Sequence, residues 1–113
     1  MPDPARGEIW TVDLDPTRGR EQSGKRPALV VSADLFNAGP AGLVVVLPLT
    51  TVDKHIRSHV SIQPPEGGVK RASFIKCEDI RCVAKERLSQ RWGSVADNTL
   101  DAVAFRLRIL LEL

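Results

Sequence analysis

Apolar residues occur in short runs over the first two thirds of the chain and at a helical spacing only near its end. The short runs are rich in Val, Ile and Leu and are separated by Pro, Gly, Asn and Asp, a pattern typical of strands joined by turns. The predicted strands span Glu8–Asp15, Pro27–Ser32, Leu43–Leu49, His59–Gln63 and Ala72–Ile80. Several short strands at nearly regular spacing predict a small β-barrel or β-sandwich.

Two prolines refine the strand assignment. Pro27 opens a continuous apolar run, and because proline cannot donate a ladder hydrogen bond, a buried strand is expected to begin there. Pro48 interrupts the third run and predicts a sheet edge or a bulge. Residues 34–42 are rich in turn formers and are expected to be a connection, as are the prolines and glycines of residues 64–68.

The apolar spacing becomes helical near the end of the chain. Ser94 followed by Asp97 fits a capping box, which predicts that the helix begins there. Its apolar stripe consists of Leu100, Val103, Ala104, Leu107, Leu110 and Leu111. Phe105, Ile109 and Leu113 widen this stripe beyond what one core contact needs, so a partner surface such as a second subunit is expected to cover them.

Composition places the chain among ordinary globular proteins. Its 113 residues are 42% hydrophobic and 27% charged, which fits one domain over residues 1–113 with an aliphatic core. No signal peptide or membrane-spanning run is present in the sequence, so a cytoplasmic protein without a membrane association is expected. The net charge of +2 is mild, and binding of a polyanion would depend on the Lys- and Arg-rich stretches 18–26 and 70–91.

The histidines and cysteines form no common metal or nucleophile motif. His55 and His59 have a spacing that makes a ligand pair only on a helix, whereas their neighbours are typical of a loop leading into a strand. We therefore expect no metal and no other cofactor. Cys77 and Cys82 match no zinc or redox spacing, and their apolar surroundings favour buried, reduced thiols over a disulfide or a catalytic thiol.

The stretch GREQSGKRP, residues 19–27, concentrates charge between a glycine and a proline. It is not a P-loop, which needs Ser or Thr after its lysine and a helix beyond. It does place Arg26 at the start of a buried strand, where proline restricts the backbone and glycine allows a close approach. This predicts a preorganised anion site. The alternative is a solvated surface loop whose charges only keep the protein in solution.

Hydroxyl groups at the end of the third predicted strand favour the anion site. Thr50 and Thr51 follow that strand directly, and strand ends are places where functional residues concentrate. An arginine together with hydroxyl donors suits a pentacoordinate phosphate, whose additional negative charge needs fixed donors. The residues thus point to chemistry on a phosphate group.

Three segments together resemble a known family. GEIWTVDLDPTRGREQSGKRPALVVS, VVVLPLTT and CEDIRCVAKERL, which come from the beginning, middle and later part of the chain, resemble the MazF/PemK family of bacterial toxins. The resemblance implies an SH3-like β-barrel with a C-terminal helix, a homodimer and a cognate MazE-like antitoxin whose extended tail covers the active site. It also implies a sequence-specific, metal-independent endoribonuclease that acts on single-stranded RNA.

The resemblance assigns roles to individual residues. The ribose 2′-hydroxyl would attack the adjacent phosphate, leaving a 2′,3′-cyclic or 3′-phosphate and a 5′-hydroxyl. Arg26 would stabilise the charge of the phosphorane, Thr50 would hold a phosphate oxygen, and Glu21 is the candidate for accepting the 2′-hydroxyl proton. Residues expected to contact RNA are Arg20, Gln22, Lys25, Thr51, Glu78 and Arg81.

Two positions depart from the family pattern. Arg20 stands where many relatives have serine, and Asp79 stands where the family often has glutamine. A strand-edge salt bridge explains Glu78, Asp79 and Arg81 almost as well as RNA contact does. Two other functions stay open from the sequence alone: a non-catalytic SH3-like module that binds nucleic acid or a peptide, and a toxin that binds DNA gyrase.

Overall fold

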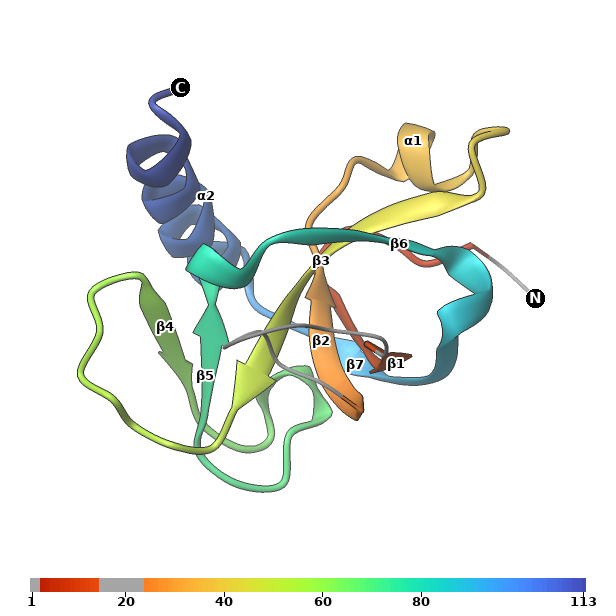
Figure 1. The fold of residues 1–113 in the computed structure, drawn as a ribbon. Coiled ribbons are helices and arrows are strands. Elements are labelled where there is room, and N and C mark those ends of the chain that lie inside the picture. Colours follow the sequence, from red (N-terminus) through yellow and green to blue (C-terminus); the bar gives the residue numbers. More distant parts are fainter. Residues whose placement is uncertain (1–2, 15–23) are drawn as a thin grey trace.

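The computed structural model describes residues 3–14 and 24–113, which form a mainly β fold with a C-terminal helix, as predicted (Figure 1). The strands are β1 (Glu8–Asp13), β2 (Lys25–Val30), β3 (Leu43–Thr50), β4 (His59–Ile62), β5 (Ser73–Lys76), β6 (Arg81–Ala84) and β7 (Leu88–Ser94). The helices are α1 (Asp34–Asn37) and α2 (Asp97–Leu111), and 3-10 turns are η1 (Glu66–Gly68), η2 (Cys77–Asp79) and η3 (Lys85–Arg87).

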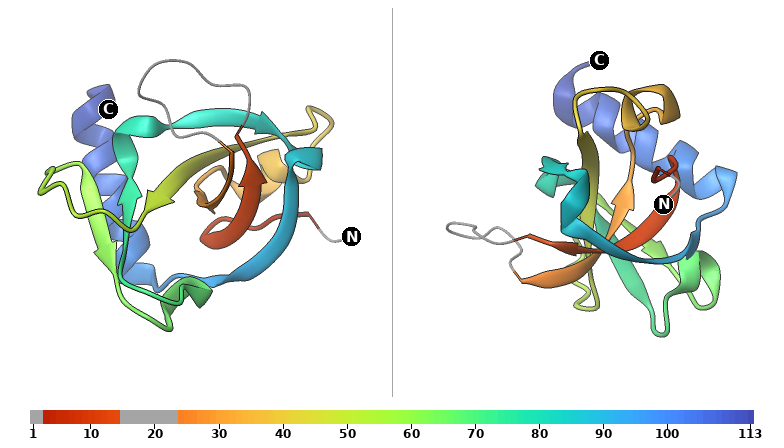
Figure 2. Two further views of the ribbon diagram at one scale, coloured as in Figure 1. Left: turned by 60° about the horizontal axis from the view of Figure 1, so that its bottom comes forward. Right: turned by 90° about the vertical axis from the view of Figure 1, so that its right-hand side faces the viewer.

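The described strands make one antiparallel sheet of seven strands. The main order is β4-β5-β3-β2-β1-β7, and β6 pairs with the first half of β3. The sheet curls into a barrel-like wall, which is seen end-on in the left panel of Figure 2. Helix α2 packs against β4 and η2 on the outside of this wall.

The central strands are buried on both faces. In β2, Leu29 belongs to one apolar cluster while Ala28 and Val30 belong to a second cluster on the opposite face. In β3, Leu47 and Val46 divide in the same way. Because side chains alternate between the faces of a strand, burial on both faces requires a continuous apolar run, and this is the pattern that identified these strands in the sequence.

Pro48 marks neither an edge nor a bulge, so that prediction is wrong. It lies inside β3, at the point where the strand changes partner: Val46 pairs with β6, whereas Leu49 pairs with β5. The N–H of Val31 donates to the carbonyl of Val45 (2.9 Å), so Val45 turns its backbone toward β2 and, by alternation, residue 48 turns away from it. The missing donor of Pro48 therefore falls in the gap between β6 and β5.

The predicted capping box at the start of α2 is wrong, and a residue distant in sequence stabilises this end of the helix instead. The helix begins at Asp97 with Ala96 as its N-cap, and Ser94 ends β7. Glu66 of η1 instead accepts hydrogen bonds from the Ala96 N–H (3.0 Å) and from the hydroxyl of Thr99 (2.5 Å). A carboxylate at a helix N-terminus also interacts favourably with the helix dipole.

Several element boundaries differ from the prediction. The strand expected over Ala72–Ile80 ends at Lys76, because the chain turns in η2, whose first residue, Cys77, is buried. Strands β6 and β7 and the short helix α1 were not predicted. Strand β2 begins at Lys25, two residues earlier than expected, and this places Pro27 inside the strand. Among the described helices, none is both long and apolar enough to cross a membrane.

Candidate active site

A pocket opens where β2 and β3 part. The paired residues of the two strands end at Ala28 and Pro48. By alternation from Val31, whose N–H bonds to β3, the backbone of Pro27 also faces β3, and the next hydrogen-bonded pair would join Pro27 to Leu49. Proline has no N–H to donate, so the ladder stops there. The missing hydrogen bond gives a local physical reason for a gap between these two strands.

The pocket contains about 340 Å³ and is lined by cations and hydroxyl groups. Its lining residues are Arg26, Pro27, Leu49, Thr50, Thr51, Val52, Lys54 and Ser73. These described lining residues include no carboxylate. Two positive charges and three hydroxyl donors around one opening favour an anionic ligand.

Arg26 and Thr50 face each other across the pocket. Two residues beyond the Ala28–Pro48 pair, the β2–β3 register places Arg26 opposite Thr50, and both line the pocket. The Thr50 Oγ1 atom accepts a hydrogen bond from the Val52 N–H (3.2 Å), which fixes the hydroxyl and leaves its proton able to be donated. The structure thus places these two side chains in the lining of one pocket.

The other predicted loop residues divide into two groups. Thr51 lines the pocket, and Lys25 is exposed one residue before Arg26, paired in register with Asp13 of β1. Arg20, Glu21 and Gln22 lie outside the described residues.

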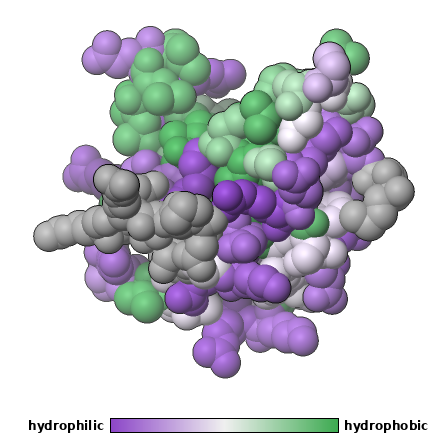
Figure 3. Space-filling model, turned by 45° about the vertical axis from the view of Figure 1, so that its right-hand side comes forward, coloured by the Kyte–Doolittle hydropathy of each residue, from purple (hydrophilic) through white to green (hydrophobic). Residues whose placement is uncertain are grey.

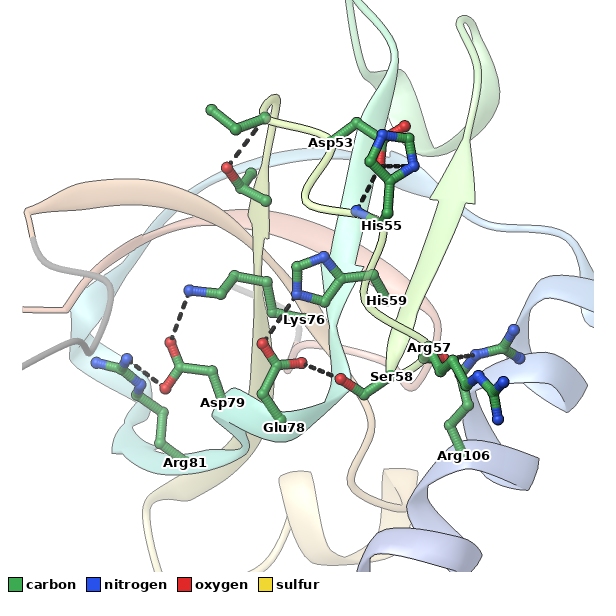
Figure 4. Close-up of polar contacts among 12 residues, drawn as sticks. Asp53, His55, Arg57, Ser58, His59, Lys76, Glu78, Asp79, Arg81 and Arg106 are labelled. Carbon is green, nitrogen blue, oxygen red and sulfur yellow. Dashed lines mark hydrogen bonds and ion pairs between the residues drawn. The ribbon is translucent and has the colours of Figure 1, made fainter.

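Glu78, Asp79 and Arg81 engage other side chains of the protein (Figure 4). Asp79 forms ion pairs with Arg81 (2.6 Å) and with the buried Lys76 (3.6 Å). The Asp79–Arg81 ion pair is the salt bridge that was the alternative to RNA contact. These ion pairs do not test whether Glu78 or Arg81 also contacts RNA.

Glu78 is held in its ionised form. It accepts hydrogen bonds from the Ser58 hydroxyl (2.7 Å) and contacts the Nε2 atom of the buried His59 (2.8 Å; Figure 4). Burial alone raises the pKa of Glu78, but the hydrogen bonds from Ser58 and His59 outweigh burial and hold this pKa below its ordinary value of 4.5. The carboxylate therefore ties the start of β4 to η2.

His55 and His59 do not converge. His55 is exposed in the loop after β3 and lies 3.6 Å from Asp53, whereas His59 begins β4 and points to Glu78 (Figure 4). Within residues 3–14 and 24–113, no group of three His, Cys, Asp or Glu side chains is arranged to hold a metal ion.

The two cysteines are free thiols in different elements. Cys77 is buried in η2, and burial raises the pKa of its thiol to about 11, so it stays protonated and unreactive at neutral pH. Cys82 lies in β6 and is exposed, so the expected burial is wrong for this residue. Its side chain faces outward because successive side chains of a strand point to opposite faces, and the next residue of β6, Val83, is the buried one.

Two polar residues of the pocket were not identified from the sequence. Lys54 follows the Thr50–Thr51 pair closely, and its charge in that loop was an available signal. Ser73 comes from β5, which pairs with β3 through Thr50 and Phe74. Its place depends on the strand register, for which a single sequence carries no local signal.

Comparisons with known proteins identify the fold and the family of this chain. Residues 5–111 match the family model described as PemK-like, MazF-like toxin of type II toxin–antitoxin systems. Endoribonuclease MazF9 of Mycobacterium tuberculosis is 37% identical, with 96% of each chain covered. The crystal structure of MazF from Deinococcus radiodurans has a TM-score of 0.85 at 28% identity and 98% coverage of each chain. The MazE–MazF complex from the same organism gives a TM-score of 0.77 at 28% identity, covering 97% of this chain and 96% of that one. The chain therefore belongs to the PemK-like, MazF-like toxin family of type II toxin–antitoxin systems.

Proposed function

We propose that this protein is a sequence-specific endoribonuclease that cuts single-stranded RNA, without a metal ion, in the pocket between β2 and β3. The observation that carries the proposal is the facing pair of Arg26 and Thr50, fixed where Pro27 ends the strand pairing. The name of the M. tuberculosis relative, an endoribonuclease, supports the same reaction. A single-stranded substrate follows because sequence-specific reading of RNA usually requires unpaired bases.

The reaction needs charge stabilisation more than a protein nucleophile. The 2′-hydroxyl oxygen attacks phosphorus, the bond from phosphorus to the 5′-oxygen breaks, and the products are a 2′,3′-cyclic phosphate and a 5′-hydroxyl. The phosphorane formed on the way carries additional negative charge on its equatorial oxygens. The Arg26 guanidinium donates to these oxygens, and the Thr50 hydroxyl holds one of them in place.

Proton transfer completes the reaction. The 2′-hydroxyl loses a proton as it attacks, and the departing 5′-oxygen gains one. We assign the first role to Glu21, which lies outside the described residues, between Leu14 and Gly24. These two residues join the ends of that segment by a backbone hydrogen bond of 2.9 Å, two residues before Arg26. Further contacts that position the RNA are assigned to Arg20, Gln22, Lys25, Thr51, Glu78 and Arg81.

A cognate MazE-like antitoxin is proposed as the inhibitor. The D. radiodurans MazF is known in complex with MazE, and its fold matches that of this chain. A segment that covers the pocket would displace RNA from Arg26 and Thr50. Since the substrate is cellular RNA, the cytoplasm is the proposed site of action.

A homodimer is proposed through the second half of α2. Phe105 (60% exposed) and Ile109 (62%) lie on this part of the helix, together with the half-exposed Leu110 and Leu111, and Leu113 (84%) follows its end. In Figure 3, hydrophobic residues gather at the upper left, over the end of α2. An apolar patch of this kind is typical of an interaction surface, and a second copy presents the same patch in a symmetric contact.

The activity is tested by incubating the purified protein with a long single-stranded RNA in EDTA and sequencing the 5′-hydroxyl ends that appear. We expect a small set of cuts that share a sequence, and no such cuts with Arg26→Ala. Arg108→Ala is the matched control, because Arg108 is an exposed arginine on α2, outside the pocket. Intact RNA, or cutting only when a divalent ion is added, contradicts the proposal.

A further inference from the structure

A second concave site lies beside the active-site pocket, on the other side of β1. It contains about 250 Å³ and is lined by Gly68, Lys70, Gln90, Arg91 and Trp92. We propose that this Trp92 pocket binds one nucleotide of the single-stranded RNA that flanks the cut, with the base stacked on Trp92 and its phosphate beside Lys70. The inference rests on the proposed RNA substrate. The volume of the Trp92 pocket lies just below the usual range of small-molecule sites, which begins at about 300 Å³. The pocket therefore fits one unit of a longer ligand.

The Trp92 indole is held in place before any ligand binds. It packs against the apolar cluster on its face of the sheet, and its Nε1–H donates to the Thr11 hydroxyl oxygen (2.8 Å). Gly68 has a φ of 79°, and a Cβ atom there would lie 2.4 Å from the carbonyl oxygen of Trp92. Glycine thus lets η1 close against β7 and form one wall of the pocket. A fixed aromatic ring stacks on a base with little loss of conformational freedom.

The charge of the Trp92 pocket comes mainly from Lys70. Arg91 forms an ion pair with Glu8 (2.5 Å) and donates to the Ser94 hydroxyl (3.0 Å), so its charge is compensated. Among residues 3–14 and 24–113, none forms an ion pair or hydrogen bond with the exposed Lys70 ammonium. An uncompensated ammonium beside an aromatic ring is the combination that proteins use to follow a single-stranded backbone.

Two paths connect the Trp92 pocket with the active-site pocket. Thr11 of β1 pairs with Pro27 of β2 on one side and with Gln90 of β7 on the other. Residues directly opposite each other point to the same face, so this row leads from one pocket to the other across two strand spacings, about 10 Å. Lys70 and Ser73 provide the second path, because they line different pockets at the two ends of residues 70–73.

Elements that line the two pockets also lie at the same end of the molecule. In the left panel of Figure 2, the start of β2, the end of β3, the start of β5 and η1 are gathered on the side turned toward the viewer. An RNA strand cut beside Arg26 can therefore continue over β1 to Trp92 without leaving this surface. The pair of pockets predicts that long substrates bind more tightly than short ones.

The test measures binding of oligouridylates that carry 2′-O-methyl groups, which cannot be cut by 2′-hydroxyl attack. Anisotropy titrations in EDTA at several salt concentrations compare oligomers of about four and about twelve nucleotides, the range of typical single-strand sites. Lys70→Glu should weaken binding of the longer oligomer roughly 3- to 10-fold and lower its salt slope by about one. The shorter oligomer should be unaffected.

Controls separate this inference from general charge and from folding. Arg108→Glu makes the same charge change on α2 and should leave both oligomers unaffected. Trp92→Ala should weaken the longer oligomer about 10-fold. Because Trp92 also packs against the core, the melting temperature of the Trp92→Ala variant is measured alongside its binding. Lys70 is exposed, so the Lys70→Glu variant tests the proposal even if Trp92→Ala does not fold.

Any of three outcomes overturns the proposed role of the Trp92 pocket. The Lys70→Glu variant binds the longer oligomer as tightly as the wild-type protein does, Lys70→Glu and Arg108→Glu lose the same affinity, or Lys70→Glu loses the same affinity for the short and the long oligomer. None of these readouts involves cleavage. Unchanged binding by Lys70→Glu in a protein that cuts RNA refutes only the Trp92 pocket. A wild-type protein that cuts no RNA refutes the proposed function, whatever the binding shows.

Discussion

The two ends of the molecule are both open to solvent but are made of opposite kinds of residues. At the end where β2 and β3 part, the pocket presents Arg26, Lys54 and hydroxyl groups. At the other end, the second half of α2 presents Phe105, Ile109 and other apolar side chains, which Figure 3 shows as a hydrophobic area. The difference indicates two separate tasks: binding an anionic ligand at the first end and contacting a protein at the second.

The backbone explains why the ends differ. The pocket forms because Pro27 cannot continue the pairing of β2 with β3, so polar side chains at the strand ends are not covered by a neighbouring strand. Helix α2 begins with Thr99 and Val103 buried against the sheet. Leu107 still packs against the core, but Phe105, Ile109, Leu110 and Leu111 of the same half are exposed. The polar end thus depends on where the pairing of β2 with β3 stops, and the apolar end depends on how far α2 continues.

The largest expected effect is at the pocket. Arg26→Ala should lower the single-turnover rate of RNA cleavage about 100- to 1000-fold, the usual consequence of removing one donor to a developing oxyanion. Because Arg26 is exposed, the melting temperature should change little. Arg108→Ala, at the apolar end, should change neither quantity. Equal rates for the two variants would remove the proposed distinction between the ends.

The second effect concerns oligomeric state. Ile109→Glu places a charge in the exposed apolar patch of α2, and a charge buried at a subunit contact without a partner is costly. Dimer dissociation should become about 100-fold easier, equivalent to about 2.7 kcal/mol. Sedimentation equilibrium measures it, with circular dichroism to verify the fold. A wild-type protein that is monomeric at high concentration contradicts the dimer.

A smaller effect concerns the close contact between η1 and β7, near the pocket end of the molecule. Gly68→Ala forces a side chain into a left-handed conformation and against the backbone of Trp92, whereas Gly42→Ala meets the same conformation, with a φ of 70°, in open space. We expect Gly68→Ala to lower the free energy of unfolding by about 1–3 kcal/mol more than Gly42→Ala does. Chemical denaturation measures the difference. Equal losses would mean that η1 does not close tightly on β7.

The smallest effect concerns Glu78, which lies between the two ends on η2, where η2 packs against α2. A carboxyl group whose folded pKa is lowered stabilises the protein above its unfolded pKa and loses this contribution as the pH falls through the folded value. Acidification below about pH 4.5 should therefore destabilise the wild-type protein more than Glu78→Gln. The difference should stay below about 1 kcal/mol, because the Glu78 side chain is 35% exposed. Identical acid profiles would contradict the role of the Ser58 and His59 contacts.

The sequence predicted those parts of the structure that depend on local pattern. Continuous apolar runs identified β2 and β3 because both strands are buried on two faces, and the helical stripe identified α2. The cap of α2 was missed because its carboxylate, Glu66, is thirty residues away from Ala96. The Trp92 pocket was missed because Lys70 and Trp92 meet only through the contact of η1 with β7.

The candidate site was predicted in part. Arg26 and Thr50 were identified through their residue chemistry and the family resemblance, and the register of β2 with β3 brings them together. Ser73 depends on the pairing of β5 with β3, which no local pattern encodes. The roles of Arg20, Glu21 and Gln22 stay predictions, because these residues lie outside the part of the chain that the structure describes.

The central claim is that the pocket of Arg26 and Thr50 uses the ribose 2′-hydroxyl as nucleophile without a metal ion. The most direct measurement compares two RNA oligonucleotides that span a mapped cut site and differ only in one 2′-deoxy substitution at the nucleotide before the cut, both incubated with the wild-type protein in EDTA. We predict that the all-RNA strand is cut and that the substituted strand stays intact. Cutting of the substituted strand, or no cutting of the all-RNA strand until a divalent ion is added, would contradict the claim.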